Sequence, residues 1–382
     1  MKYNRKFSYE LPDKEHRIVG MDTNEEKIII LLSSSQMLAG KIKYESAKET
    51  FKFFLDPINL HFHSGPIVGM DVCVRKPLIA TASKDKTIKI WNYEDRTVET
   101  PKSEAESALC LSFHPSGLHL AVAYSDKLRI LNLQKEGESV SNFKDINSFR
   151  NCTFVKFSNG GQYFAASSGN VVHVFKFYTG ENPPGMTFSG HSGKIRAMAW
   201  SKEDNILVTC GADGIIMAYR VGMENCGSKL LYLHSTKEPR TKGLIYSSIS
   251  INPDNTIYAM GMMAGNNERV FKEVRLDGSE NKRDLNQNNC SQLTFPSTGR
   301  ILFCGTDDKD NYSGTIKCYK FPNTQHMEEF QAHDNLGVEK VAVTADDKYL
   351  ISAGRDGCLM VFEIRDKEAR SDKIKEVLPV SN

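Results

Sequence analysis

Eight similar units of about forty to fifty residues follow one another along this chain, and this repeat limits the folds that it can adopt. Each unit has a strand-like stretch, a turn rich in Gly, Pro, Asn or Asp, and a second, more apolar stretch. The ends of the first stretches lie 40 to 51 residues apart, at Asn24, Cys73, Phe113, Phe157, Trp200, Ile251, Phe295 and Val343. Such a period, with about four strands per unit, is typical of a β-propeller. We therefore predict an all-β chain built of four-stranded blades.

The unit from His63 to Trp91 has the most complete set of polar residues. His63, Ser83, Asp85 and Trp91 fall at the spacing of a WD40-type repeat. In such a blade the indole donates to the hydroxyl, the hydroxyl bonds the His, and the His bonds the Asp, so each buried polar group has a partner. We predict that these four residues form a structural tetrad. A Ser buried in a strand could not reach a substrate, so no catalytic Ser-His-Asp role is predicted.

Two later units retain part of this set. Both keep the His and the Asp, but Gly takes the expected hydroxyl position and another aromatic residue replaces the Trp. The corresponding residues are His191, Gly211, Asp213 and Tyr219 in one unit and His333, Gly354, Asp356 and Phe362 in the other. We expect packing to hold these blades in place of the complete tetrad.

The units from 61 to 366 resemble one another more than they resemble the unit at 16–55, which lacks a Trp and a turn Asp. We predict a seven-bladed propeller at 61–366, an N-terminal extension or partial extra blade at 1–60 and a tail at 367–382. An eight-bladed ring is the alternative. A ring must close to protect its strand edges. The last unit needs an outer strand from Thr50–Leu55 or Ile374–Val380, and we favour the first because it would lock the chain's start to its end.

The composition does not strongly favour binding to nucleic acid or to a membrane. The 382 residues carry a net charge of +2, and 25% of them are charged. No apolar run approaches the roughly 18 residues of a membrane-spanning helix, and the first residues lack the apolar core of a signal peptide. The nine cysteines are an odd number without a CxxC pair. They predict reduced, buried thiols in a cytosolic or cytoskeletal protein.

No cofactor, metal or small-molecule substrate is predicted. The stretch 307–314 is rich in Asp, but it lacks the closing Glu of a calcium loop, and no phosphate-binding Gly-rich loop occurs. A propeller enzyme would need acidic or His side chains in its channel, whereas the first strands, which should line it, are mostly apolar or small. The 307–314 turn and the 265–268 turn should protrude on the face of the His loops. Their candidate interaction residues are Asn266, Asn267, Glu268, Asp307, Asp308, Asp310 and Asn311.

Nine short strings, in order, resemble the second propeller of a family of cilia- and flagella-associated WD-repeat, coiled-coil proteins. The resemblance extends from about residue 16 to residue 370. The strings are HSGPIVGMDVC (63–73), RKPLIAT (75–81), HPSG (114–117), DKLR (126–129), FSNGG (157–161), GNVVHV (169–174), GHSGKIR (190–196), QAH (331–333) and DGCL (356–359).

The resemblance implies a scaffold of the ciliary axoneme. Members of that family have two tandem seven-bladed propellers and a long coiled coil, and are linked to inner dynein arms and regulatory complexes on doublet microtubules. This chain would hold the second propeller, with 16–55 as the last blade of the first, and would stop before the coiled coil. We therefore expect a non-enzymatic scaffold in the cytoskeleton of the cilium, with axonemal partners such as inner dynein arm or regulatory-complex subunits or tubulin. A general WD40 adaptor in another cytosolic multi-protein assembly is the alternative.

Overall fold

The computed structural model of the chain contains only β strands in the part that it describes. This part comprises residues 17–24, 27–32, 37–41, 43–45, 50–52, 55–57, 62–99, 106–133, 141–146, 149, 151–221, 230–233, 243–265, 268–276, 279–283, 285, 289–307, 314–334 and 336–365. The strands form antiparallel sheets in which strands that follow one another in the sequence pair, except that β3 (Met37–Lys41) pairs with β6 (Leu55–Pro57). The predicted all-β architecture is confirmed.

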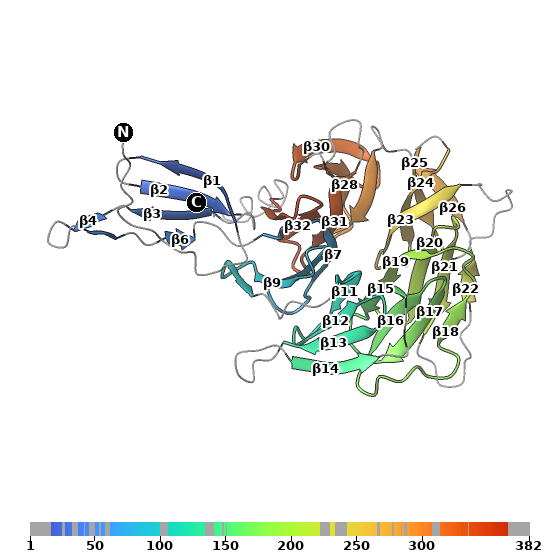
Figure 1. Cartoon of the computed structure of the whole chain (residues 1–382). Coiled ribbons are helices and arrows are strands. Elements are labelled where there is room, and N and C mark those ends of the chain that lie inside the picture. The colour runs from blue at the N-terminus through green and yellow to red at the C-terminus, as the bar shows by residue number, and fades with distance from the viewer. Residues whose placement is uncertain are drawn as a thin grey trace, which may run out of the picture.

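Three sheets, here called blades 1 to 3, come first in the ring of Figure 1. Blade 1 holds β7 (Ile67–Val72), β8 (Leu78–Ser83), β9 (Ile88–Asn92) and β10 (Thr97–Glu99); blade 2 holds β11 (Cys110–Phe113), β12 (His119–Ala123), β13 (Leu128–Asn132) and β14 (Ser141–Ile146); blade 3 holds β15 (Cys152–Phe157), β16 (Tyr163–Ser168), β17 (Val171–Lys176) and β18 (Thr187–Ser189).

Four further sheets, blades 4 to 7, continue the ring. Blade 4 holds β19 (Ile195–Trp200), β20 (Ile206–Gly211), β21 (Ile216–Arg220) and β22 (Leu230–Leu233); blade 5 holds β23 (Leu244–Ile251), β24 (Ile257–Met263), β25 (Arg269–Val274) and β26 (Glu280–Arg283); blade 6 holds β27 (Cys290–Thr294), β28 (Ile301–Thr306), β29 (Thr315–Lys320) and β30 (Gln325–Gln331); blade 7 holds β31 (Val338–Val343), β32 (Tyr349–Gly354) and β33 (Leu359–Glu363).

The turns between the first and second strands of the blades explain why the chain reverses where it does. Most of them contain a residue with a left-handed backbone, and that residue is Gly, Asn or Asp, the types that tolerate this conformation. Examples are Gly117 (φ 70°), Asn255 (φ 61°) and Asp347 (φ 57°). Some of these turns also join neighbouring blades, since the Asp347 carboxylate accepts a hydrogen bond from the Ser297 backbone N–H at 2.8 Å.

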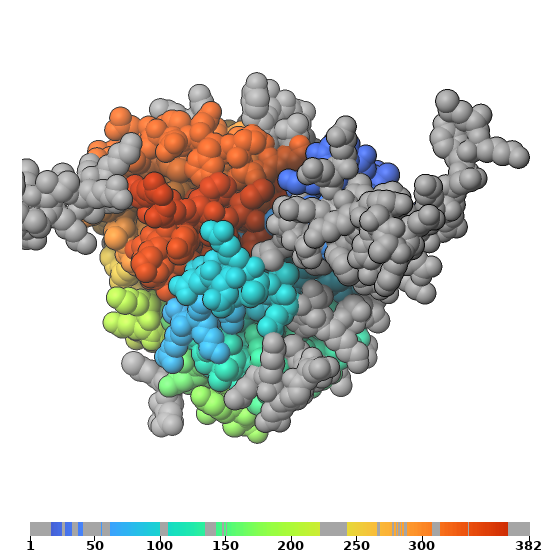
Figure 2. Space-filling view, turned by 90° about the vertical axis from the view of Figure 1, so that its left-hand side faces the viewer, coloured from blue at the N-terminus to red at the C-terminus, as the bar shows by residue number. Residues whose placement is uncertain are grey.

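The core of the ring lies between blades. Seven apolar clusters each combine side chains from two adjacent blades, and burial of this apolar surface is the main driving force for their association. The innermost strands contact one another in order, and β31 returns to β7. At this return, Ile67, Ile79 and Trp91 of blade 1 pack against Ile351 and Ala353 of blade 7. Figure 2 shows the cyan surface of blade 1 against the red surface of blade 7.

Blade 7 has three strands among the residues that the structure describes, whereas the other blades of the ring have four. The prediction that residues 50–55 supply its outer strand is wrong. β5 (Thr50–Lys52) pairs with β4 (Lys43–Glu45), and β6 (Leu55–Pro57) pairs with β3 (Met37–Lys41). Both strands pair with strands that lie close to them in the sequence, so only short connections have to be closed. The other candidate strand, at 374–380, and the predicted tail lie outside the described residues.

A separate sheet precedes the ring and stands to one side of it in Figure 1. It consists of β1 (Ile18–Thr23), β2 (Lys27–Leu32), β3 and β6 in that order. Ile30, Leu32 and Leu38 are buried in a small cluster, whereas Ile29 and Leu31, which point to the opposite face, are exposed. The sheet has a blade's strand order but covers one apolar face only partly.

Candidate functional site

The polar network of blade 1 joins the His loop to the second and third strands. His63, which is buried, lies with Nδ1 3.0 Å from Asp85 Oδ2 and Nε2 2.7 Å from Thr81 Oγ1. A carboxylate can only accept, so Nδ1 carries the proton and Nε2 accepts from the Thr81 hydroxyl. The Trp91 indole donates to the same hydroxyl oxygen at 2.8 Å. Asp85 also accepts from Thr87 Oγ1 at 2.7 Å, which fixes the turn.

The bridging hydroxyl is Thr81, and the prediction of Ser83 for this position is wrong. Thr81 and Ser83 are two residues apart on β8 and therefore point to the same face of the blade. Thr81 lies deeper in the strand, within reach of Trp91. Ser83 sits at the strand's end, where its hydroxyl donates to the Gly65 carbonyl at 2.8 Å and accepts from the Asp85 backbone N–H at 3.2 Å. The other three predicted members, His63, Asp85 and Trp91, do meet in one network.

Blade 4 contains a second network, centred on His191. Its Nε2 lies 2.8 Å from Thr209 Oγ1, and its Nδ1 lies 3.1 Å from Asp213 Oδ2. The bridging hydroxyl again lies two residues before the predicted position, which Gly211 occupies. Tyr219 replaces the Trp and donates to Met217 Sδ at 2.8 Å. Burial raises the pKa of Tyr219 to about 12, so it stays a protonated donor.

Blade 7 contains the third network. His333 Nε2 lies 2.8 Å from Ser352 Oγ, and Nδ1 lies 3.1 and 3.2 Å from the two oxygens of Asp356. Phe362, at the Trp position, packs against Phe330 with ring centroids 4.8 Å apart. The expectation that blades 4 and 7 are held mainly by packing missed the His–hydroxyl–Asp network that a strand hydroxyl completes in each.

A missing Cβ makes room for the networks of blades 4 and 7. A Cβ on Gly211 would lie 2.6 Å from Asp213 Oδ1 and 2.9 Å from His191 Nδ1, and one on Gly354 would meet the equivalent atoms of blade 7. Blade 1 accommodates Ser83 because its Asp85 faces His63 with one oxygen only, at 3.0 Å. Gly211 and Gly354, which were interpreted as the loss of a hydroxyl, therefore leave the space that the network needs.

Burial and hydrogen bonding set the charges within the networks. Burial alone would raise the pKa of Asp85, Asp213 and Asp356, but hydrogen bonds from the His and from the turn hold each pKa below its usual value. Burial lowers the pKa of His63 against the opposing pull of Asp85. The network of blade 1 therefore pairs a neutral imidazole with a carboxylate at neutral pH, which suits a fixed brace.

These networks have no accessible nucleophile or metal site. The bridging hydroxyls Thr81, Thr209 and Ser352 are buried in the sheets. No cluster of His, Cys, Asp or Glu in the described residues could hold a metal ion. Burial raises the pKa of Cys210 to about 12 and that of Cys318 to about 12, so these thiols are protonated and unreactive at neutral pH. In the part of the chain that the structure describes, no helix is long and apolar enough to cross a membrane.

The two predicted interaction turns are described only at their edges. Glu268 is exposed, and its carbonyl closes the turn by accepting from the Met263 N–H at 2.8 Å. Asp307 is not a free side chain, because its carboxylate pairs with Arg269 and lies 3.8 Å from Arg355 Nη2. The remaining candidates, Asn266, Asn267, Asp308, Asp310 and Asn311, lie outside the described residues.

A cavity of about 280 Å³ occupies the centre of the ring, between the innermost strands. Asp71 Oδ1 pairs with Lys156 Nζ at 2.6 Å, while Oδ2 accepts from Ser112 Oγ and the Phe113 N–H, both at 2.8 Å. Lys340 also lines this space. The expectation of a mostly apolar or small lining missed these charged side chains.

Comparison with known proteins connects this geometry to a family. The family described as WD domain, G-beta repeat matches residues 57–92, 182–220 and 324–363. These ranges contain the three His–hydroxyl–Asp networks, in blades 1, 4 and 7.

Three similar proteins extend the match to nearly the whole chain. Cilia- and flagella-associated protein 57 C of Tetrahymena thermophila is 40% identical over 385 residues, which cover 96% of this chain and 29% of that protein. Cilia- and flagella-associated protein 57 of Mus musculus is 34% identical, over 95% of this chain and 26% of that protein. Protein 57 A of Tetrahymena thermophila is 32% identical, over 90% and 28% respectively. The chain thus spans less than a third of the length of each relative.

The ring of sheets and its three polar networks define a WD-repeat β-propeller protein. Over most of its length the chain is similar to Cilia- and flagella-associated protein 57, and the resemblance predicted from the nine sequence strings is confirmed.

Proposed function

We propose that this chain is a non-enzymatic scaffold propeller of the ciliary axoneme, positioning inner dynein arm or regulatory complexes on doublet microtubules. The observation that carries the proposal is the similarity to proteins named for cilia and flagella over 90 to 96% of the chain. The geometry is consistent with it, because the His, Asp and hydroxyl groups are used internally as braces. The groups left to contact partners are then those that the networks do not use.

We propose the same domain boundaries that the repeat predicts. Residues 61–366 form a seven-bladed propeller, 1–60 an extension with a partial extra blade, and 367–382 a tail. Support comes from the return of β31 to β7 and from the seven apolar clusters, each shared by two neighbouring blades. The extension has its own sheet and its own small core.

The proposed partners are axonemal proteins, including inner dynein arm subunits, regulatory-complex subunits and tubulin. We keep the exposed turn at Glu268 as an interaction candidate. Asp307 serves a different purpose, because its pairing with Arg269 and Arg355 joins blades 5, 6 and 7.

The proposal is tested by locating and deleting the protein in a ciliated cell. A tagged full-length protein should lie along the axoneme, and cryo-electron microscopy of deletion axonemes should show inner dynein arms or regulatory complexes missing at a fixed repeat. A tag excluded from cilia, or a deletion with a complete set of arms, would contradict the proposal. A cytosolic location with other co-purifying proteins would instead support a general WD40 adaptor.

A further inference from the structure

We propose that the central cavity of the ring binds an acidic side chain presented by a partner protein. The site is the space between Asp71, Lys156, Gln292 and Lys340, and its ligand is a Glu or Asp carboxylate within an acidic peptide segment. The inference rests on the proposed scaffold function, since it names the chemistry of a protein that the propeller would hold.

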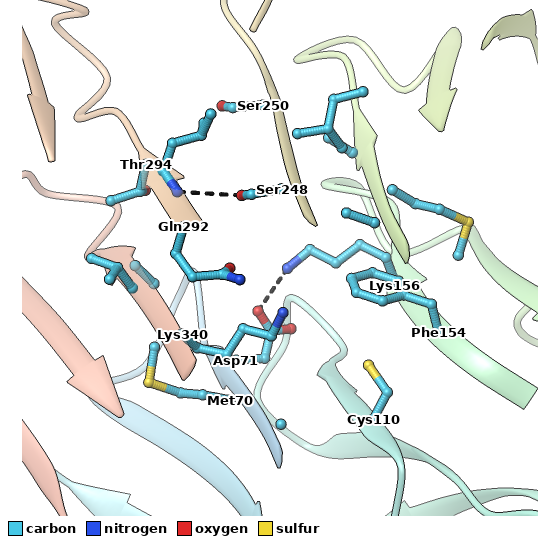
Figure 3. A pocket seen from close by; sticks show the side chains of 18 of the residues that line it. Met70, Asp71, Cys110, Phe154, Lys156, Ser248, Ser250, Gln292, Thr294 and Lys340 are labelled. Atoms are coloured by element: carbon cyan, nitrogen blue, oxygen red, sulfur yellow. Dashed lines mark hydrogen bonds and ion pairs between the residues drawn. The ribbon is translucent and has the colours of Figure 1, made fainter. Parts of the chain in front are cut away.

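The innermost strands place the polar side chains at two levels of the cavity. The strand registers align Asp71 of β7, Lys156 of β15 and Thr294 of β27 next to the turns that lead to the second strands. Gln292 of β27 and Lys340 of β31 lie two residues further toward the opposite face. In Figure 3 the long side chains of Lys156 and Lys340 extend into the same space from different blades.

The charges in the cavity do not balance. Its lining contains one carboxylate, Asp71, and two ammonium groups, Lys156 and Lys340. Both carboxylate oxygens of Asp71 already have partners, because one binds Lys156 at 2.6 Å and the other accepts from Ser112 and from the Phe113 N–H. Among the described residues, Lys340 has no carboxylate within ion-pair distance, and its Nζ lies 5.8 Å from the centroid of the Phe154 ring. The cavity therefore carries one excess positive charge beside an aromatic ring.

Uncharged polar groups complete the lining on the other side. Ser248, Ser250, Gln292 and Thr294 come from blades 5 and 6. Hydroxyl and amide groups can donate to a carboxylate, and such charge-assisted bonds are stronger than neutral ones. A cation would be repelled by Lys340, whereas an anion would gain both the charge and these donors.

The size of the cavity can accommodate a single side chain. Its volume of about 280 Å³ lies just under the roughly 300–1,000 Å³ of typical small-molecule pockets. A glutamate side chain on a peptide lying across the opening would bring its carboxylate between Lys340 and Lys156. The surrounding peptide would then rest on the turns of the ring, where it could gain further contacts.

The test uses a fluorescein-labelled hexaglutamate peptide as the probe and the full chain, with fluorescence anisotropy at low salt. Wild-type protein should bind the peptide, and binding should weaken as salt rises. Lys340→Gln should weaken binding on the order of tenfold, and Lys340→Glu should abolish it, while Lys340→Arg should retain it. The matched control is Lys202→Gln, which removes an exposed lysine outside the cavity and should leave binding unchanged. Thermal unfolding of each variant checks that the ring is intact.

Equal weakening by Lys340→Gln and Lys202→Gln would overturn the proposal, because binding would then follow overall charge. Loss of binding in Lys340→Arg, with an unchanged unfolding curve, would also overturn it. A third overturning result is displacement of the peptide by inorganic phosphate at concentrations where free acetate has no effect, which would assign the site to phosphate.

Cellular location gives an independent readout. A chain that lies in the axoneme but does not bind the peptide would disprove this inference alone. A chain that binds the peptide but is absent from cilia would disprove the scaffold function alone.

Discussion

Blades 1 and 7 meet where the ring closes, and they solve the same bracing problem with different residues. Both hold a buried His between a turn Asp and a strand hydroxyl. The distances from the two His ring nitrogens to the Asp and hydroxyl oxygens lie between 2.7 and 3.2 Å. In blade 1 Trp91 donates a further hydrogen bond to the hydroxyl, whereas blade 7 has Phe362 there. Blade 1 tolerates Ser83 beside its Asp, whereas blade 7 has Gly354.

The difference indicates which part of the network a blade needs. The His, the hydroxyl and the Asp bind one another, so removing any of them takes a hydrogen-bond partner from the buried groups that remain. The aromatic position is less strict because an apolar ring brings no polar group that must be satisfied. Blade 4 lies between these cases, since Tyr219 finds its acceptor in Met217.

The largest expected effect comes from removing the histidine of each network. His63→Ala leaves Thr81 and Asp85 with lost partners inside blade 1, and we expect a loss of about 3 kcal/mol in the free energy of unfolding. His333→Ala should cost about as much, since Ser352 and Asp356 lose the same contacts. Urea unfolding with hydrogen exchange at each blade measures both losses. A loss under about 0.5 kcal/mol in either blade would mean that its network is not a brace.

The next largest effect separates the two positions that precede the Asp. Gly354→Ala places a Cβ against His333 and Asp356, and such overpacking should cost about 2 kcal/mol. The matched change in blade 1, Ser83→Ala, adds no atoms and removes only the hydrogen bonds to Gly65 and Asp85, so we expect about 1 kcal/mol. Thermal unfolding of both variants should give this order. The reverse order would contradict the role of Gly354 as a spacer.

A smaller effect comes from exchanging the aromatic residues. Trp91→Phe removes the indole donor to Thr81 and should cost about 1 to 2 kcal/mol. Phe362→Trp offers blade 7 a donor for Ser352 and should change stability by less than about 1 kcal/mol in either direction. Urea unfolding checks both. If Trp91→Phe proved neutral, blade 1 would need its Trp no more than blade 7 does.

The smallest effect concerns pH. Because burial lowers the pKa of His63 in the folded chain, the unfolded chain binds a proton more readily below its ordinary pKa of about 6.5. Stability should therefore be full above pH 6.5 and fall as pH drops from there toward 5. His63→Gln should make this fall shallower without removing it, since burial also lowers the pKa of His114 and His119. Unfolding midpoints at pH 7.5, 6.5 and 5.5 test this, and an unchanged slope in the variant would contradict it.

The blades could be read from the sequence because their signals are local. Turn residues such as Asn255 and Gly117 mark each reversal, and the spacing of His63, Asp85 and Trp91 lies within one blade. The error at Ser83 arose because residues two apart on a strand share a face, and spacing alone does not say which hydroxyl lies deep enough to meet the indole.

Other features depend on residues that are far apart in the sequence. Asp71 and Lys156 form an ion pair in the cavity although 85 positions separate them, and no local pattern predicts such a contact. The pairing of β5 and β6 was predicted wrongly because ring closure was assumed to need a shared strand. The structure brings blades 1 and 7 together through side-chain packing, a contact for which the strand pattern carries no signal.

This manner of closure has a mechanical consequence. Among the described strands none hydrogen-bonds across the joint between blades 1 and 7, and one backbone bond, from the His63 N–H to the Gly357 carbonyl at 3.1 Å, links their loops. Tension between Phe62 and Arg365 would load this joint directly. No strand ladder joins the other neighbouring blades either among the described residues, but the continuous chain connects each of those pairs. The joint between blades 1 and 7 lacks such a connection, so tension on the two ends of the ring would open it first.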